Sequence, residues 1–179
     1  MEKLSVIIPC YNEALTIEKV ISDFKNKLPD AKIFVFDNCS TDETKKVASS
    51  AGAFVIDSVK KGKGNVIIHA REVVNSENYI IIDGDDTYQI ENLDEIIEQY
   101  FSNDADMLIG TRFSNYSNKA FRKFHIFGNK MISNLVSILF YTKVNDVLSG
   151  FRIIKRDCFK NLYLRTQNFE IETEMTIQA

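Results

Sequence analysis

The chain has 179 residues, of which 45% are hydrophobic and 26% are charged, and its formal net charge is −3 at pH 7. This length suits one domain with a buried core and is too short for two independent domains. The negative balance argues against a protein that binds nucleic acid, because affinity for phosphate backbones depends on clustered Lys and Arg.

Short β-branched runs alternate with helical patterns along the chain. The strands predicted from their apolar, β-branched composition are 4–9, 32–37, 53–56, 79–83 and 106–110. The helices predicted from their 3.6-residue spacing are 14–28, 42–51, 65–75 and 93–101. The most apolar strand, 79–83, is expected to be central. This alternation predicts an α/β fold, a single Rossmann-like domain with a mostly parallel central sheet flanked by helices.

The last third of the chain is less regular. Residues 114–123 are polar and without periodicity, so a loop is expected there, and 127–140 predicts a helix with one apolar face. Packing in the core is the simpler explanation of that face. The chain ends inside a helical pattern at 169–175, so the full protein is expected to continue, with membrane segments as one option.

Acidic side chains follow three of the predicted strands, in the segments 9–13, 37–42 and 83–88. In a parallel sheet these segments share one edge, where ligands bind. Carboxylates that lie close together repel each other unless a cation separates them. Asp83 and Asp85 are hard oxygen ligands that suit Mg²⁺ or Mn²⁺, and Gly84 between them lets a ligand approach. An ordinary Asp-rich turn is the alternative explanation of this motif.

The loop 60–64 combines three lysines with two glycines before a predicted helix. Its positive charge and backbone N–H groups predict a phosphate site, although an isolated loop of this kind is more often a solvated turn. The loop lacks the P-loop pattern, and no GxGxxG follows the first strand.

Six segments together resemble family 2 glycosyltransferases with the A-type, nucleotide-sugar-binding fold, and they occur in the family's order: 6–13, 37–42, 62–65, 83–88, 110–112 and 149–152. The resemblance implies that Pro9, Tyr11 and Glu13 line the nucleobase and ribose pocket. It implies further that Asp37 accepts a hydrogen bond from the base. It also implies a nucleotide-sugar-binding half at 1–112 and an acceptor-side half at 113–179.

The resemblance also assigns residues to the donor diphosphate. Lys63 and Gly64 would lie close to the nucleotide, and Asp83 and Asp85 would hold the metal that bridges the diphosphate. Arg112 would face the phosphates or the acceptor.

Within the family, the segment 146–152 is most similar to the dolichol- or polyprenyl-phosphate mannose synthase-like branch, which has D-x-x-S-G-F-R there. In that branch the region of 127–140 contacts the membrane, which implies a peripheral membrane contact. Thr87 stands where that branch often has Gln. The acceptor therefore stays open between a polyprenyl phosphate and a cell-envelope glycan.

The expected reaction is inverting transfer of a sugar from a UDP- or GDP-sugar. A metal at Asp83 and Asp85 would act as a Lewis acid, and Lys63, Arg112 or Arg152 would add fixed positive charge. For a hydroxyl nucleophile the candidate base is Asp146, with Glu172 behind it. A lipid phosphate needs no strong base and would meet the basic residues Lys119, Arg122 and Lys123.

Two other functions stay open. A sugar nucleotidyltransferase needs a Gly- and Arg-rich phosphate loop after the first strand, where this chain has Cys10-Tyr11-Asn12-Glu13. A non-catalytic nucleotide- or sugar-binding module would need no metal pair.

The three cysteines form no CxxC pair, and no stretch reaches the roughly 18–20 apolar residues that span a bilayer. Residues 1–3 lead directly into a strand rather than a secretory signal. A cytoplasmic protein with reduced thiols is therefore expected, with the inner face of the membrane as a further option.

Overall fold

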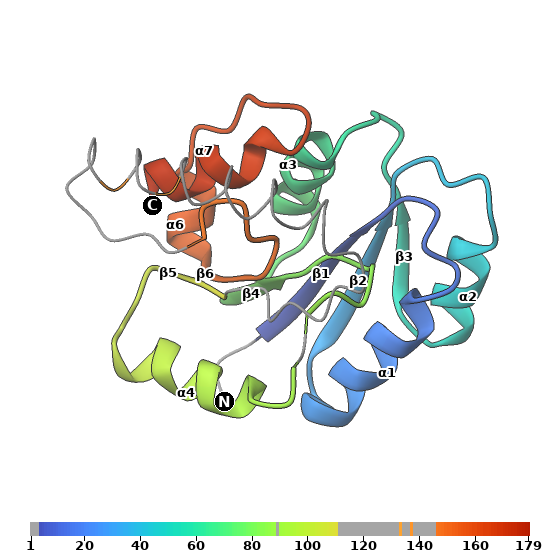
Figure 1. The fold of residues 1–179 in the computed structure, drawn as a ribbon, viewed down its shortest axis with the longest axis horizontal. Helices are drawn as coiled ribbons and strands as arrows, with labels where there is room; N and C mark the ends of the chain where they lie inside the picture. Colours follow the sequence, from blue (N-terminus) through green and yellow to red (C-terminus); the bar gives the residue numbers. More distant parts are fainter. Residues whose placement is uncertain (1–3, 89, 111–132, 134–136, 138–145) are drawn as a thin grey trace, which may run out of the picture.

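The computed structural model describes residues 4–88, 90–110, 133, 137 and 146–179 (Figure 1). Six strands form one sheet in the order β3-β2-β1-β4-β6-β5. Their bounds are β1 Leu4–Cys10, β2 Lys32–Asp37, β3 Phe54–Asp57, β4 Asn78–Ile81, β5 Met107–Ile109 and β6 Arg152–Lys155. The predicted α/β fold is confirmed.

Strands β1 to β4 are parallel to one another, and their order determines at which edge of the sheet a ligand binds. The chain moves outward from β1 through β2 to β3 and then returns to place β4 on the other side of β1. In sheets of this kind ligands bind in the crevice at the carboxyl ends of the strands where the strand order switches, which here is between β1 and β4. The segments after residues 10 and 81 lie at this point.

Helices cover both faces of the sheet (Figure 1). The first face carries α1 Ile17–Lys27, α2 Thr44–Ser50 and α4 Leu93–Ser102, and the second carries α3 Lys63–Val73, α6 Arg156–Asn161 and α7 Glu170–Gln178. Each layer packs its buried apolar residues against the alternating side chains of β1 and β4. Burial on both faces explains why these strands are continuously apolar.

The first helix begins later than the sequence predicts. The carbonyl of Glu13 accepts hydrogen bonds from the amides of Thr16 (3.1 Å) and Ile17 (3.0 Å), which closes a turn before the helix. Leu15, which the helical spacing included, is 99% exposed in this turn. Conversely, α3 begins at Lys63, two residues before the predicted start at residue 65.

The sequence did not predict β6. It has only four residues, Arg and Lys stand at its ends, and just two apolar residues lie between them. In the structure it runs antiparallel between β4 and β5, with Ile81 opposite Arg152. A strand from the second half of the chain is thus inserted into the sheet of the first half. The division at residue 112 remains a prediction.

None of the helices in the described ranges is long and apolar enough to cross a bilayer. The three cysteines are free. The predicted loop at 114–123 and the predicted amphipathic helix at 127–140 fall outside the described residues, apart from Ser133 and Ser137.

Candidate active site

The loops that leave β1, β2 and β4 turn sharply at the carboxyl edge of the sheet. Each contains one non-glycine residue with positive φ: Asn12 (57°), Cys39 (65°) and Asp86 (56°). Such conformations are costly and persist where surrounding contacts fix them, often at functional sites.

Hydrogen bonds between side chains and backbone tie these loops together. The amide of Glu13 donates to Thr44 Oγ1 (2.8 Å), and the amide of Thr41 donates to Asn12 Oδ1 (2.7 Å). Thr16 Oγ1 donates to the carbonyl of Gly84 at 2.7 Å, which links the loop after β1 to the loop after β4. The predicted site residues of these loops are therefore held in fixed relative positions.

Glu13 has a largely buried carboxyl group between β1 and β4. Burial raises its pKa to about 7; the charges of Asp85 and Asp83 add to this rise, whereas the Cys10 thiol and Lys63 lower the pKa. Among the described residues, no N–H or O–H group donates to Glu13 Oε2. The backbone of Gly84 packs directly against this oxygen and against Cys10 Sγ.

Asp37, at the end of β2, has a fully buried side chain. Its Oδ2 accepts a hydrogen bond from the amide of Ser40 (3.1 Å) and lies 3.7 Å from Lys45 Nζ. Within the described part of the chain, Asp37 Oδ1 has no donor. An acceptor of this kind is what the resemblance requires for a bond from a nucleobase.

Acidic groups from three strands meet at this edge. The pKa of the buried Cys10 thiol is raised well above its ordinary value, first by burial and then by the charges of Glu13, Asp37 and Asp83. The predicted gathering of carboxylates around the end of β1 is thus present.

The predicted metal ligands follow β4. Asp85 is exposed, and its Oδ1 accepts hydrogen bonds from the amide (3.1 Å) and Oγ1 (2.6 Å) of Thr87. The side chain of Asp83 is 14% exposed and forms an ion pair with Lys63. A side-chain carbon at position 150 would collide with the Asp83 carboxylate and force it to shift.

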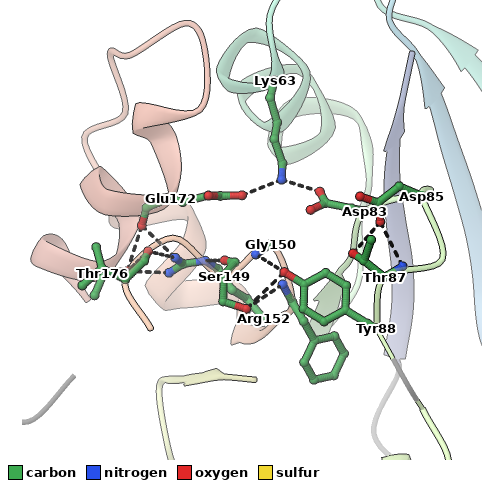
Figure 2. A network of polar contacts seen from close by, with 12 residues as sticks. Lys63, Asp83, Asp85, Thr87, Tyr88, Ser149, Gly150, Arg152, Glu172 and Thr176 are labelled. Atoms are coloured by element: carbon green, nitrogen blue, oxygen red, sulfur yellow. Dashed lines mark hydrogen bonds and ion pairs between the residues drawn. The ribbon is translucent and has the colours of Figure 1, made fainter. Parts of the chain in front are cut away.

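Lys63 connects two carboxylates that lie far apart in the sequence (Figure 2). Its side chain is 8% exposed, and its ammonium group contacts Asp83 and lies 2.6 Å from Glu172 Oε1 at the start of α7. The ring of Phe169 has its centroid 5.8 Å from the same nitrogen. Lys63 therefore joins the loop after β4 to the C-terminal helix.

In and directly after the loop 60–64, some backbone N–H groups donate hydrogen bonds within the protein. The amide of Gly62 donates to Asn38 Oδ1 (2.7 Å), and the amide of Asn65 donates to the carbonyl of Gln167 (3.2 Å). Gly64 packs against the carbonyl of Thr166, where a side-chain carbon would collide. Within the loop 60–64, the N–H group of residue 62 is therefore not available to a phosphate, because it holds the loop in place.

Arg152 is 1% exposed and lies among backbone carbonyls (Figure 2). Its guanidinium donates to the carbonyls of Ser149 (3.1 Å), Val147 (3.0 Å) and Glu172 (2.8 Å), and to Thr176 Oγ1 (2.9 Å). Burial lowers its pKa to about 10, so the group stays positive at neutral pH. These bonds fasten the first turn of α7 to the segment before β6.

Tyr88 holds the same segment from the other side. Its hydroxyl oxygen accepts a hydrogen bond from the amide of Gly150 (2.6 Å) and lies 3.3 Å from Ser149 Oγ. Ser149 Oγ also donates to the carbonyl of Gly110. The 149–152 segment thus forms the wall behind Asp83, a role that sequence analysis missed for Tyr88 and Ser149.

The sequence matches the family described as "Glycosyl transferase family 2" over residues 5–163. The chain belongs to this family. The predicted class of enzyme, a glycosyltransferase, is confirmed.

Relatives of the glycosyltransferase include Protein RfbJ of Shigella flexneri, 47% identical over 122 residues that cover 68% of this chain and 95% of that protein. Glycosyltransferase AglJ of Haloferax volcanii is 34% identical over 183 residues, which cover 99% of this chain but only 58% of AglJ. A similar fold occurs in glucosyl-3-phosphoglycerate synthase from Mycobacterium tuberculosis, crystallised with Mn²⁺ and UDP-glucose. Its TM-score is 0.79 at 20% identity, covering 98% of this chain and 63% of that chain.

The remaining predicted site residues of the glycosyltransferase lie in different surroundings. Pro9 is buried within β1, opposite Phe36 of β2, and Tyr11 is 52% exposed with Lys61 Nζ 6.0 Å from its ring centroid. Asp146 is 9% exposed, and its charge acts on Arg152. Arg112 and the basic residues Lys119, Arg122 and Lys123 fall outside the described residues.

The donor set fits a divalent cation that a diphosphate also binds. Among the described residues, no group of three His, Cys, Asp or Glu side chains is arranged to hold a metal without other ligands. Mg²⁺ in phosphate-binding sites typically takes one or two protein carboxylates, with phosphate and water as further ligands. Asp83 and Asp85 are carboxylates of this kind, and Glu13 Oε2 beside Gly84 is a further buried oxygen to which no N–H or O–H group of the described residues donates.

Proposed function

We propose that this glycosyltransferase moves a hexose from a UDP- or GDP-sugar to an acceptor with inversion at the anomeric carbon, and that it uses Mg²⁺ or Mn²⁺. The observation that carries the proposal is the meeting of Glu13, Asp37 and Asp83 around the end of β1. Burying several carboxylates together without a ligand is unfavourable. A sugar nucleotide with its cation would complete their coordination and hydrogen bonding.

In this proposal the nucleobase lies at Asp37, with Pro9, Tyr11 and Glu13 along the base and ribose. The buried Oδ1 of Asp37 would accept an N–H of uracil or guanine. Lys63 and Gly64 lie near the nucleotide, on the loop that Asn38 and Gln167 fix. The fold relative crystallised with Mn²⁺ and UDP-glucose supports a donor of this class.

Asp83 and Asp85 would hold the cation, with Gly84 between them close to Glu13. A bound Mg²⁺ or Mn²⁺ would supply Lewis-acid stabilisation of the departing diphosphate. Lys63 and Arg112 would add fixed positive charge where negative charge develops. Arg152 would act indirectly by holding α7 in place, since its guanidinium faces carbonyls rather than the crevice.

The proposed acceptor is a polyprenyl phosphate or a cell-envelope glycan, reached from the cytoplasmic face of a membrane. The similarity of segment 146–152 to the polyprenyl-phosphate branch supports the first. For a hydroxyl acceptor, Asp146 would accept the proton, whereas Glu172 is already paired with Lys63. For a lipid phosphate, Lys119, Arg122 and Lys123 would receive the anion.

A thermal-shift panel with Mn²⁺ and UDP-, GDP- or dTDP-sugars tests the donor. A ligand present at about 100 times its Kd stabilises the folded state by roughly 2.7 kcal/mol, which is easily measured. We expect one nucleotide to raise Tm, and EDTA to abolish most of the rise. No shift with any sugar nucleotide would contradict the proposed pocket.

A further inference from the structure

The position of Lys63 bears on how a divalent cation reaches Asp83. Lys63 stands at the first residue of α3 and reaches across to the loop after β4, where its ammonium group contacts Asp83 Oδ1. Both carboxylate oxygens lie close to Gly150, where an added side-chain carbon would collide with Oδ2 and stand 2.8 Å from Oδ1. A cation that binds Asp83 through Oδ1 would therefore take the place of Lys63.

A displaced ammonium group that stayed buried without a partner would be unfavourable. Lys63 avoids this because Glu172 Oε1 already lies 2.6 Å from its nitrogen. Both side chains of this pair are nearly inaccessible, at 8% and 6% exposed. Lys63 can thus release Asp83 and keep its ion pair with Glu172 (Figure 2).

Glu172 is well fixed for the second role. Its carbonyl accepts hydrogen bonds from Arg152 at 2.8 Å and from Thr176 Oγ1 at 2.8 Å, and Arg152 belongs to β6 inside the sheet. The first turn of α7 is thereby anchored to the sheet. Glu172 can therefore keep its ion pair with Lys63 while its own backbone stays in place.

We propose that Lys63 is a resident counter-cation of Asp83 that a divalent cation displaces, and that Glu172 is the positioning residue that then retains Lys63 beside the site. This inference rests on the proposed function, because it needs a cation at Asp83. The exchange leaves a positive charge beside Asp83 both with and without the metal. It also leaves the ammonium group close to where a diphosphate would bind.

Mn²⁺ titrations without nucleotide, followed by the loss of the free-ion electron paramagnetic resonance signal, test the exchange. Lys63 contacts the carboxylate oxygen that Mn²⁺ would bind and places a like charge beside it, so its replacement by Gln removes both obstacles to the cation. We expect Lys63→Gln to bind Mn²⁺ about tenfold or more tightly than wild type. The control is Lys19→Gln, which removes the ammonium partner of Asp86 (2.7 Å) on the same loop.

Lys19→Gln should change Mn²⁺ affinity by less than about threefold, because the Lys19 side chain is 61% exposed and its ion pair is weak. Equal effects of the two variants, or no gain in Lys63→Gln, would overturn the inference. The proposed function would stand in that case if wild type still binds Mn²⁺ together with UDP. Failure of wild type to bind Mn²⁺ with UDP would overturn both.

A crystal structure of wild type with Mn²⁺ and UDP gives a second test that does not depend on the folding of a variant. We expect Lys63 Nζ to be within hydrogen-bond distance of Glu172 and no longer of Asp83. Lys63 still in contact with Asp83 Oδ1 beside bound Mn²⁺ would contradict the exchange.

Discussion

Two buried carboxylate oxygens at the carboxyl edge of the sheet, Glu13 Oε2 and Asp37 Oδ1, have no N–H or O–H donor in the described part of the chain. Most buried polar atoms in proteins are paired, so unpaired ones call for a ligand or a bound water. Asp37 ends β2 and Glu13 follows the end of the adjacent strand β1, where Cys10 is paired with Asp37. They are the parts of the site at which single substitutions are most informative.

Glu13 makes the metal-free protein sensitive to pH. Its pKa is about 7 in the folded state against 4.5 for an unperturbed carboxyl, so the folded state retains a proton that the unfolded state loses. The protonated Glu13 carboxyl group therefore stabilises the folded state fully below the pKa of the unfolded state, and this stabilisation is lost as the pH rises through the pKa of the folded state. In EDTA, we expect the free energy of unfolding of wild type to fall between about pH 5 and about pH 8 by up to roughly 3 kcal/mol more than that of Glu13→Gln. Urea denaturation measures this; parallel pH profiles would contradict it.

Asp37→Asn should weaken binding of the nucleoside diphosphate by about tenfold or more, because a charged acceptor of the base is lost. Its free energy of unfolding should change by less than about 1 kcal/mol, since Lys45 is a half-exposed partner at 3.7 Å. Asp57→Asn is a matched control. Asp57 Oδ1 also forms an ion pair with Lys45, at 2.6 Å from its Nζ, but Asp57 lies on the edge strand β3. Calorimetric titration with UDP and GDP checks both variants, and equal affinities would contradict the role of Asp37.

At the scale of elements, the 149–152 segment and α7 form one support for the site. Gly150 lies directly behind Asp83, and Tyr88 and Arg152 hold the segment from either side. Arg152 also binds the first turn of α7, which carries Glu172. Disturbing this support should affect the metal site without breaking the sheet.

Gly150→Ala introduces a side-chain carbon against the Asp83 carboxylate. We expect Mn²⁺-dependent UDP binding to weaken about tenfold or more, with a loss of unfolding free energy of roughly 1–3 kcal/mol, as is typical of overpacking. Circular dichroism should show an intact fold. Wild-type binding in this variant would mean that Asp83 can move without consequence.

Arg152→Met removes the donors that anchor α7. We expect roughly 2–4 kcal/mol less stability, because several buried carbonyls lose their partner, and faster amide hydrogen exchange in α7 than in α1. Thr176→Val is a milder control that removes only one acceptor of Arg152. Uniformly faster exchange across the chain would argue against a local anchor.

These elements also mark where sequence reasoning succeeded and where it could not. Strand β2 has the predicted bounds 32–37, because apolar runs covered on both faces give an unambiguous signal. The strand β6 was missed because it has only four residues, two of them charged, and because its partners β4 and β5 are distant in the sequence. The contact of Lys63 with Glu172 joins residues 109 positions apart and likewise has no local signature.

At the scale of the whole molecule, the sheet order explains why the candidate site lies where it does. Two of the acidic segments that the sequence singled out, 9–13 and 83–88, lie at the ends of β1 and β4, where the strand order switches, and the third, 37–42, lies at the end of the neighbouring strand β2. Strand ends could therefore be assigned to one edge from the βα alternation alone. The sequence alone did not show that Arg152 and Glu172, from the last third of the chain, support the site together with Tyr88.

The central claim is that Asp83 and Asp85 hold a cation needed to bind the sugar nucleotide. Calorimetric titration of UDP and GDP in Mn²⁺ and in EDTA, on wild type, Asp85→Asn and Asp86→Asn, tests it most directly. Asp86 is the control, because it is adjacent but paired with Lys19 at 2.7 Å. We expect Mn²⁺-dependent binding in wild type and Asp86→Asn and its loss in Asp85→Asn. Nucleotide binding that is equally tight in EDTA, or unchanged in Asp85→Asn, would contradict the claim.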